Sequence, residues 1–502
     1  MNGSAYLELF KLAVPETIVA LAVLAVLVAD LWALRGLELK FRRTIGAMIS
    51  CAGCVGAIAW MAVSPQQGNI AEGMLVVGPL TQLVKAALLV LTVFTILISV
   101  DTDFTTHSGE YFALVLLATL GMMFLVSSED ILMIFISLEL TSLSLYILTA
   151  FAKRRARSAE AALKYFLFGG MAAAFTLFGL SLLYGISGST NLAQIAISIK
   201  GPKLDPLLAV AMVMTLVGFG FKVAAVPFHL WAPDAYQGAP APSAALIASG
   251  SKVAGFFVLA KVVMVGFKGA EGSAAWHACV PGWMPVLALL AVASMVLGNL
   301  AAIVQTSIRR LLAYSAVAHG GYMLLGVLGH GGQSLAALLY YVITYALTTL
   351  GAFGVVSVVQ EQSGDDKLSD FAGLSRRAPL VSLCMMIFML SLAGIPPLAG
   401  FFGKFYVFAA ALNTDPGGLG LLWLVILALG MSAVSLYYYL QVLKQIYVTE
   451  TPAGAAAARI PVLSQVVLVL LALAVVALGC APDLLISKLL SAVQLAAGSA
   501  PK

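Results

Sequence analysis

Charged side chains are scarce in this chain, and their scarcity decides its class. Only 10% of the 502 residues are Asp, Glu, Lys or Arg, whereas 62% are hydrophobic. This composition excludes a soluble globular protein, and apolar runs of about 20 residues are long enough to cross a bilayer as helices. The net charge of +5 is therefore interpreted through the positions of basic residues around a membrane, and not as a surface for nucleic acid.

Cysteines and cofactor motifs are also few. The five cysteines form no disulfide framework, and Cys51 and Cys54 make a single C-x-x-C inside an apolar run, which favours small packed residues over metal or redox chemistry. The chain has no P-loop, and its many glycines lie in apolar segments. The sequence therefore predicts no metal and no cofactor in this chain, and no means of its own to use ATP or NADH.

The sequence predicts neither a cleavable leader nor a soluble domain. The first apolar run contains Glu16 and Asp30, lacks a basic leading region and has no small-residue cleavage site, so we interpret it as a retained helix. No low-complexity tail or long linker interrupts the later apolar runs. We expect residues 1–502 to form one integral membrane domain.

The apolar runs predict an all-α, polytopic protein of about fourteen helices. The mixed polar segment after Gly188 is the longest connection, and we expect it along the membrane interface. The expected helices are 12–34, 44–63, 79–100, 110–127, 130–151, 159–187, 206–230, 241–267, 282–305, 311–329, 334–360, 380–412, 418–447 and 461–487.

Basic residues predict the orientation of these helices. Most of them follow odd-numbered helices, which places those connections in the cytoplasm and both termini in the periplasm. The acidic connection 101–110 and the lysines Lys200, Lys203 and Lys268 go against this pattern. The residues that support it are Arg35, Lys40, Arg42, Arg43, Lys153, Arg154, Arg155, Arg157, Arg309, Arg310, Lys367, Arg376, Arg377 and Lys444.

Two of the predicted helices contain prolines beside a buried lysine. In the seventh helix Pro227 lies between Lys222 and His229, and a proline cannot donate to the carbonyl four residues earlier. In hydrocarbon such a carbonyl must be satisfied by protein or water, so a hydrated pocket for protons or ions is indicated. The twelfth helix is interrupted at Gly394, Pro396 and Pro397 and carries Lys404.

The positions of the two interruptions predict an internal repeat. They are five helices apart, and a five-helix unit repeated once must run in the opposite direction, as in inverted-repeat transporters. We therefore pair helices 4–8 (residues 106–270) with helices 9–13 (residues 280–448). Three helices (residues 1–105) precede this pair, and one helix (residues 455–502) comes after it.

Ionisable groups within the apolar runs are the candidate functional residues, because a charge in hydrocarbon is costly unless it is paired, hydrated or protonated. Glu139 lies ten residues into the fifth helix, near Thr141, Ser142 and Ser144, and we expect Lys222 to be its partner. Lys252 lies among small residues in the eighth helix, and Lys404 lies deep in the twelfth. Together with His319 these groups have the pattern of a proton relay.

Other polar residues are open to more than one interpretation. His229 and Lys164 are further relay candidates, although Lys164 follows Glu160 by four residues and is equally explained as a simple helical ion pair. Lys261, Lys85 and Asp130 are expected to be structural. Residues 437–439 (YYY) favour an interfacial or packing cluster.

Four segments carry a family resemblance. They are FKVAAVPFHLWAPDAYQGAP (221–240), SGSKVAGF (249–256), IRRLLAYSAVAHGGYMLLG (308–326) and LAGIPPLAGFFGKFYVF (392–408). Over nearly the whole chain the sequence resembles the antiporter-like membrane subunits of respiratory complex I, and above all subunit N of the bacterial NADH:quinone oxidoreductase. Lys404 favours the N type over the M type, which has glutamate there, and the chain lacks the long lateral helix of the L type.

The resemblance implies a proton-translocating subunit of a larger complex in the bacterial inner membrane. Glu139 and Lys222 then match the family's pair on the fifth and seventh helices, Lys252 its central base and Lys404 its exit residue. NADH, FMN, iron–sulfur clusters and quinone are implied on partner subunits. Two alternatives remain: a subunit of a multi-chain cation/proton antiporter, and a membrane scaffold whose buried charges only fix helix packing.

Overall fold

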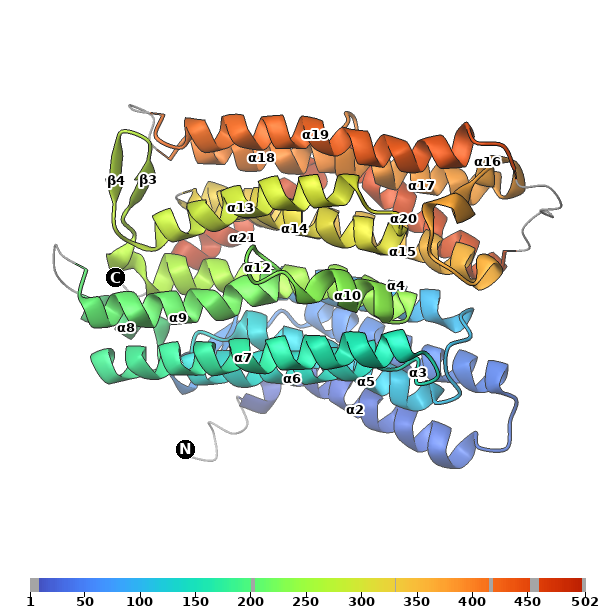
Figure 1. Ribbon diagram of the computed structural model, residues 1–502. Helices are drawn as coiled ribbons and strands as arrows, with labels where there is room; N and C mark the ends of the chain where they lie inside the picture. Colours follow the sequence, from blue (N-terminus) through green and yellow to red (C-terminus); the bar gives the residue numbers. More distant parts are fainter. Residues whose placement is uncertain (1–8, 200–203, 330, 415–418, 452–459, 499–502) are drawn as a thin grey trace.

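The computed structural model describes residues 9–199, 204–329, 331–414, 419–451 and 460–498. Within these ranges, thirteen helices are long and apolar enough to cross a membrane, and two shorter ones, α17 (Pro379–Ala393) and α18 (Ala399–Leu412), come one after the other as halves of a fourteenth. The long helices lie side by side with nearly parallel axes (Figure 1). The predicted all-α polytopic fold is confirmed.

Three helices form the N-terminal part. They are α2 (Val14–Val28), which continues in a π-helical turn over Ala29–Ala33, α3 (Leu39–Val63) and α4 (Pro79–Val100). The bounds of α4 are those expected from the sequence, because Pro79 at its start and the turn at Asp101 mark both ends. A small antiparallel hairpin, β1 (Gly68–Ile70) with β2 (Leu75–Val77), connects α3 to α4.

The first predicted repeat spans α5 to α12, and its seventh transmembrane segment is divided. The predicted span 206–230 is divided, as Pro227 indicated, and its regular winding stops before the proline, at Val223, where Ala224 takes a left-handed conformation with φ 57°. The helices are α5 (Ser108–Ser127), α6 (Ile131–Thr149), α7 (Ala156–Ser187), the short connecting α8 (Leu192–Ser198), α9 (Pro206–Val223), α10 (Trp231–Gly238), α11 (Ala241–Ala248) and α12 (Gly250–Lys261).

The second predicted repeat contains α13 (Trp283–Ile303), α14 (Ile308–Leu328), α15 (Gly331–Ser363), α17, α18 and α19 (Leu422–Tyr447). The hairpin of β3 (Ser273–Ala275) and β4 (Ala278–Val280) precedes it, and the single turn α16 (Leu374–Arg377) leads into α17. The C-terminal part holds two helices, α20 (Val462–Cys480) and α21 (Asp483–Gly498), where one helix over 461–487 was expected. Pro482 falls between them and explains the division.

The two divided spans break in the same way. The helix α9 ends at Ala224 and α17 ends at Gly394, both in the left-handed region, and each break contains a cis proline, Pro227 in one and Pro397 in the other. Matching breaks five spans apart are the geometry expected of two inverted five-helix units.

The centre of the bundle is formed by α11 with α12, α14 and α15, whose residues are almost wholly buried. The outer helices α2, α3, α7 and α19 bury one stripe and expose large apolar side chains, as helices that face lipid do. Polar groups on the central helices are therefore the best shielded from lipid within the described ranges.

A buried ion pair fixes the N-terminal helices, and it supplies a first prediction. Lys85 Nζ of α4 lies 2.6 Å from Glu16 Oε1 of α2, and both side chains are 1% exposed. Breaking such a pair leaves an isolated buried charge and costs about 3–5 kcal/mol, whereas replacing both partners is close to neutral. Lys85→Met should lower the melting temperature of the purified protein, and Glu16→Gln with Lys85→Met should restore most of it. Equal losses in the single and double variants would contradict this.

Candidate functional site

Lys404 satisfies the backbone that is left open in the broken twelfth span. Its Nζ donates to the carbonyls of Leu392 at 3.1 Å and Ala393 at 3.0 Å. These carbonyls lie four residues before Pro396 and Pro397, which have no N–H to offer them. A third donation reaches Ser432 Oγ of α19 at 2.8 Å. The prolines thus leave two carbonyls without a backbone donor, and the ammonium group of Lys404 donates to both.

The break in the seventh span is arranged around Lys222, which lies buried in the last turn of α9. Its Nζ donates to Ser142 Oγ of α6 at 3.3 Å. Pro227 withholds an N–H from the carbonyl of Val223, whereas Trp231 Nε1 donates to the neighbouring carbonyl of Phe221 at 3.0 Å. The unwound backbone is thereby held open beside the lysine.

Gly320 of α14 separates this break from Lys252. A Cβ at Gly320 would lie 3.4 Å from the carbonyl oxygen of Val223 and 3.8 Å from Lys252 Nζ. The carbonyl freed by Pro227 and the ammonium group of Lys252 therefore face the same small space. The glycine leaves that space open.

Lys252 occupies the centre of the bundle on α12. It is 2% exposed, and its Nζ donates to the carbonyl of Ala316 and lies 5.6 Å above the ring of Tyr345. Ser249, between α11 and α12, has non-helical angles (φ −110°, ψ −83°), so the eighth span is also irregular three residues before the lysine.

His319 continues the contacts from Lys252 towards the second repeat. Its ring lies 4.9 Å from that of Tyr345, and its two nitrogens meet the hydroxyls of Tyr341 at 2.7 Å and Tyr439 at 3.0 Å. Both ring nitrogens thus have hydrogen-bond partners. Ser315 Oγ lies 2.5 Å from the Tyr439 hydroxyl, so this group also has two polar neighbours.

Asn299 connects this cluster to Lys404. Tyr438, whose ring packs 4.5 Å from that of Tyr439, donates to Asn299 Oδ1 at 3.0 Å, and Asn299 Nδ2 donates to the Tyr322 hydroxyl at 2.9 Å. Lys404 Nζ lies 5.2 Å from the Tyr322 ring. We call the whole series the polar row: Lys222, Lys252, Tyr345, His319, Tyr439, Tyr438, Asn299, Tyr322 and Lys404.

The polar row crosses the bundle instead of running along one helix. Its members come from α9, α12, α13, α14, α15, α18 and α19. Figure 1 shows these helices from the green α9 and α12 near the middle to the orange α18 and α19 at the top. Three of the predicted lysines and His319 are thus brought together by side chains from other helices.

Glu139 lies at the edge of this arrangement. It is half-buried, and it shares the outer face of α6 with the exposed apolar residues Leu132, Ile136, Leu143 and Ile147. Its charge interacts through space with that of Lys222, but within the described ranges no ion pair joins the two groups. Lys222, the partner expected for Glu139, thus interacts with it through space and without a direct contact in the described structure. A carboxylate on such a surface is costly unless it is paired, hydrated, protonated or covered.

His229 and Lys164 lie outside the polar row. His229 is buried near the ring of Tyr314 at 6.3 Å, and its Nδ1 has no hydrogen-bond partner in the described structure. Lys164 makes the helical pair with Glu160 at 2.7 Å and a second pair with Asp234 at 2.9 Å. Lys261, expected to be structural, donates to the carbonyls of Val126 and Ser128.

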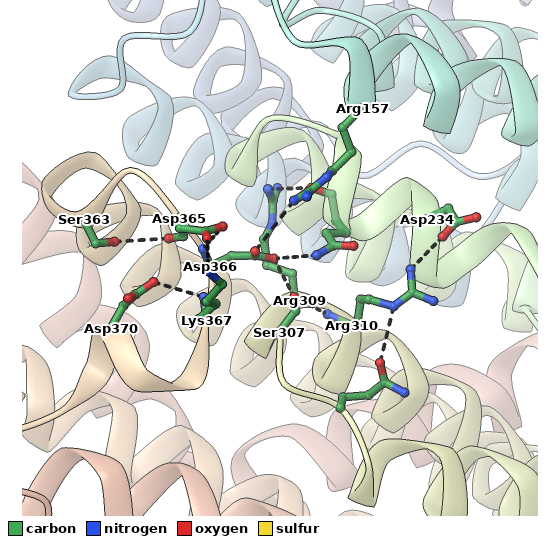
Figure 2. A network of polar contacts seen from close by, with 12 residues as sticks. Arg157, Asp234, Ser307, Arg309, Arg310, Ser363, Asp365, Asp366, Lys367 and Asp370 are labelled. Carbon is green, nitrogen blue, oxygen red and sulfur yellow. Dashed lines mark hydrogen bonds and ion pairs between the residues drawn. The ribbon is translucent and has the colours of Figure 1, made fainter.

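An ionic network at the ends of the helices joins the two repeats (Figure 2). Asp234 of α10 accepts from Arg310 of α14 at 2.7 Å, and Arg309 donates to the carbonyls of Gln237 and Ala239. Asp366, after α15, accepts from Ser307 at 2.5 Å. We call this network the seam, because α10 belongs to the first predicted repeat and α14 to the second.

Sequence reasoning missed the connecting side chains of the polar row. Residues 437–439 were interpreted as a packing or interfacial cluster, yet Tyr438 and Tyr439 contribute hydroxyls to hydrogen bonds with Asn299 and His319. The available signal was that Asn299 and Tyr345 are polar residues inside apolar helices. Their partners, however, lie on other helices and cannot be read from spacing along the chain.

Comparisons with known proteins agree with this geometry. Residues 128–433 match the family model described as NADH:quinone oxidoreductase/Mrp antiporter, transmembrane. A relative from Acidobacterium capsulatum, NADH-quinone oxidoreductase subunit N 2, is 54% identical over 97% of this chain and 99% of its own length.

Solved structures show the same fold. A chain of respiratory complex I from Thermus thermophilus is 34% identical, with a TM-score of 0.77 over 95% of this chain and 99% of that one. A chain of the Mrp complex from Dietzia sp. DQ12-45-1b shares the fold, with a TM-score of 0.80 at 22% identity over 96% of this chain and 97% of that one.

Two adjacent glycines of α14 test the packing around the site. A Cβ at Gly321 would lie 2.7 Å from Met295 Cγ and 2.8 Å from the carbonyl oxygen of Ala291, so α13 and α14 would be forced apart. At Gly320 the nearest atom is 3.4 Å away, an ordinary contact. We expect Gly321→Ala to destabilise the protein by about 1–3 kcal/mol and Gly320→Ala to leave its melting temperature nearly unchanged. The reverse order would refute the packing described here.

Proposed function

From the premise that this chain belongs to the family of antiporter-like N subunits of NADH:quinone oxidoreductase, we propose that the polar row is the path along which it moves protons. As a subunit N, the chain is a multi-pass membrane component of the respiratory complex, an enzyme that couples oxidation of NADH by quinone to proton pumping, and its partners are the other subunits of that complex. The proposal assigns this pumping to particular residues.

The observation that carries the proposal is the burial of three lysines linked by hydroxyl, imidazole and amide groups. Lys222, Lys252 and Lys404 are each at most 6% exposed, and none of them has a carboxylate within ion-pair distance in the described structure. A buried ammonium group without a counter-ion is poised to release its proton when its surroundings change. Tyrosine hydroxyls and a histidine between such groups can each accept one proton and release another.

Glu139 is the group through which a partner acts on the path. A charge or a helix brought against the outer face of α6 changes the field at Lys222 and shifts the proton from Lys222 to Lys252 and then towards Lys404. Coupling requires two states of the protein with different proton affinities along the row. Lys164 and His229 lie outside the polar row and are secondary candidates for proton transfer, with Lys164 paired to Glu160 and Asp234.

The orientation and the cofactors complete the proposal. The basic connections face the cytoplasm and both termini face the periplasm of a bacterial inner membrane. NADH, FMN, iron–sulfur clusters and quinone belong to partner subunits, since this chain contributes only proton transfer. The likeness to an Mrp chain keeps a cation/proton antiporter subunit as the second candidate, and at 22% identity that likeness concerns the fold alone.

Removing the lysines tests the proposal in the assembled complex. Lys222→Ala, Lys252→Ala and Lys404→Ala should each abolish this chain's share of the protons pumped per NADH oxidised, because a positioned acid–base group contributes about 100-fold or more to proton transfer. Lys261→Ala, on the same helix as Lys252, should leave the ratio unchanged. The measurement is proton uptake into proteoliposomes together with NADH oxidation.

The variant Glu139→Gln tests whether the charge of Glu139 regulates proton transfer along the polar row. The amide keeps the shape of the side chain and removes the charge on the outer face of α6, so pumping should fall while the complex still assembles. If neither the lysine variants nor Glu139→Gln altered the ratio of protons to NADH, the polar row would be structural and the scaffold interpretation would stand.

A further inference from the structure

A cavity lies between the ends of three helices that come from distant parts of the chain. It has a volume of about 180 Å³ and is bounded by α4, α15 and α20. Since a single buried water needs about 10–15 Å³ of such space, the cavity has room for a metal ion together with several water molecules. The polar residues Asp101, Ser357, Glu361 and Ser464 are part of its wall.

Two carboxylates of this wall have no positive partner in the described part of the chain. Asp101 Oδ2 accepts from Ser464 Oγ at 2.7 Å. Glu361 Oε1 accepts from the backbone N–H of Asp103 at 3.2 Å. Among the described residues, no lysine, arginine or histidine lies within ion-pair distance of either carboxylate. One oxygen of each carboxylate is thus left without a donor from the protein.

Arg43 of α3 is bound to the turn after α4 and pairs with a different carboxylate. Its guanidinium forms an ion pair with Asp103, which does not line the cavity. It also donates to the carbonyls of Thr102 at 2.8 Å and Thr105 at 3.1 Å. The negative charge of the cavity is therefore not balanced by this arginine.

The helix ends around the cavity add to its negative potential. Asp101 is the residue at which α4 ends, and Glu361 lies in the last turn of α15. The last carbonyls of a helix have no partner within it and give its C-terminal end a partial negative charge, which favours cations. Two such ends and two carboxylates therefore meet at one cavity.

The hydroxyl of Ser357 is a separate indication that the cavity has an occupant. Ser357 lies one turn before Glu361 in the cavity wall, is 3% exposed, and makes no hydrogen bond through its side chain to any described residue. Other buried helical serines, such as Ser382, donate to the carbonyl four residues earlier. Because buried hydroxyls are almost always bonded to protein or to a bound species, the oxygen of Ser357 is available to a ligand in the cavity.

The available oxygens fit a hydrated magnesium ion. Mg²⁺ prefers oxygen ligands, retains several of its waters and is commonly held by one or two carboxylates, whereas Ca²⁺ takes about six to eight oxygens. Within the described residues, no three His, Cys, Asp or Glu side chains are grouped closely enough to hold an ion by themselves. Two carboxylates with space for water therefore favour Mg²⁺ over Ca²⁺, and the lack of nitrogen and sulfur ligands disfavours zinc.

We propose that this cavity binds one hydrated Mg²⁺ ion, held by Asp101 and Glu361 and contacted by the hydroxyl of Ser357. The ion joins α4, from the three N-terminal helices, to α15 of the second predicted repeat and to α20 of the C-terminal part. Because the ion binds only where these three helices are packed together, it stabilises their packing. The inference is independent of the proton path along the polar row.

Hydrogen–deuterium exchange in the purified complex tests the binding of Mg²⁺. The complex is first treated with EDTA, and exchange is followed by mass spectrometry in residues 98–103 and 355–363. Addition of MgCl₂ should slow the exchange in both segments, because the bound ion opposes local opening of the helix ends. NaCl at the same ionic strength should leave the exchange unchanged, and an equal slowing by NaCl would show general screening and overturn the inference.

Three variants locate the effect at the cavity. Asp101→Asn and Glu361→Gln should each raise the MgCl₂ concentration for half-maximal slowing by about tenfold or more, since changes around a metal site typically cost 10–100-fold in affinity. The control Asp365→Asn removes a carboxylate one turn after Glu361 that pairs with Lys367 at 3.1 Å outside the cavity wall (Figure 2). It should leave that concentration unchanged. Equal concentrations in all three variants and the unaltered complex would contradict the site.

A direct view of the cavity does not depend on the variants folding. An electron cryomicroscopy map of the unaltered complex in MgCl₂ should show a compact density in the cavity with oxygen atoms at about 2.1 Å, and a map after EDTA treatment should lack it. A density that EDTA leaves unchanged, or a side chain of a neighbouring subunit in its place, would overturn the inference.

Discussion

The structure depends on one constraint: a peptide carbonyl in hydrocarbon must have a donor. Two proline-containing breaks remove the donors of Val223, Leu392 and Ala393 in the middle of the bundle. At the second break Lys404 supplies the missing bonds, and at the first the freed carbonyl faces Lys252 across Gly320. The need to satisfy the backbone thus explains why ammonium groups can persist in an otherwise apolar interior.

The same constraint separates what could be predicted from what could not. The two helix breaks and the lysines beside them could be predicted from the sequence, because proline and lysine within an apolar run are local signals. The extent of the seventh helix was misjudged, since nothing at Ala224 itself indicates a left-handed residue. The second C-terminal helix, α21, was missed although Pro482 marks its start.

The contacts between helices lay beyond sequence reasoning. Tyr439 meets His319 across 120 residues of chain, and Lys85 meets Glu16 across the N-terminal helices. Spacing along one helix shows which residues share a face, and it does not show which face of another helix they meet. Lys85 was expected to be structural, and it pairs with Glu16, a partner that the sequence did not indicate. The expected interaction of Glu139 with Lys222 acts through space.

The seam has a mechanical consequence. Arg309 and Arg310 of α14 bind two carbonyls at the end of α10 and the carboxylate of Asp234 on α10, so the two predicted repeats are joined at one end of the bundle. In transporters that work by rocking one half against the other, hydrogen bonds and ion pairs like these would have to break in every cycle. We therefore expect the two predicted repeats to stay fixed relative to each other during turnover, so that proton transfer depends on movements of side chains.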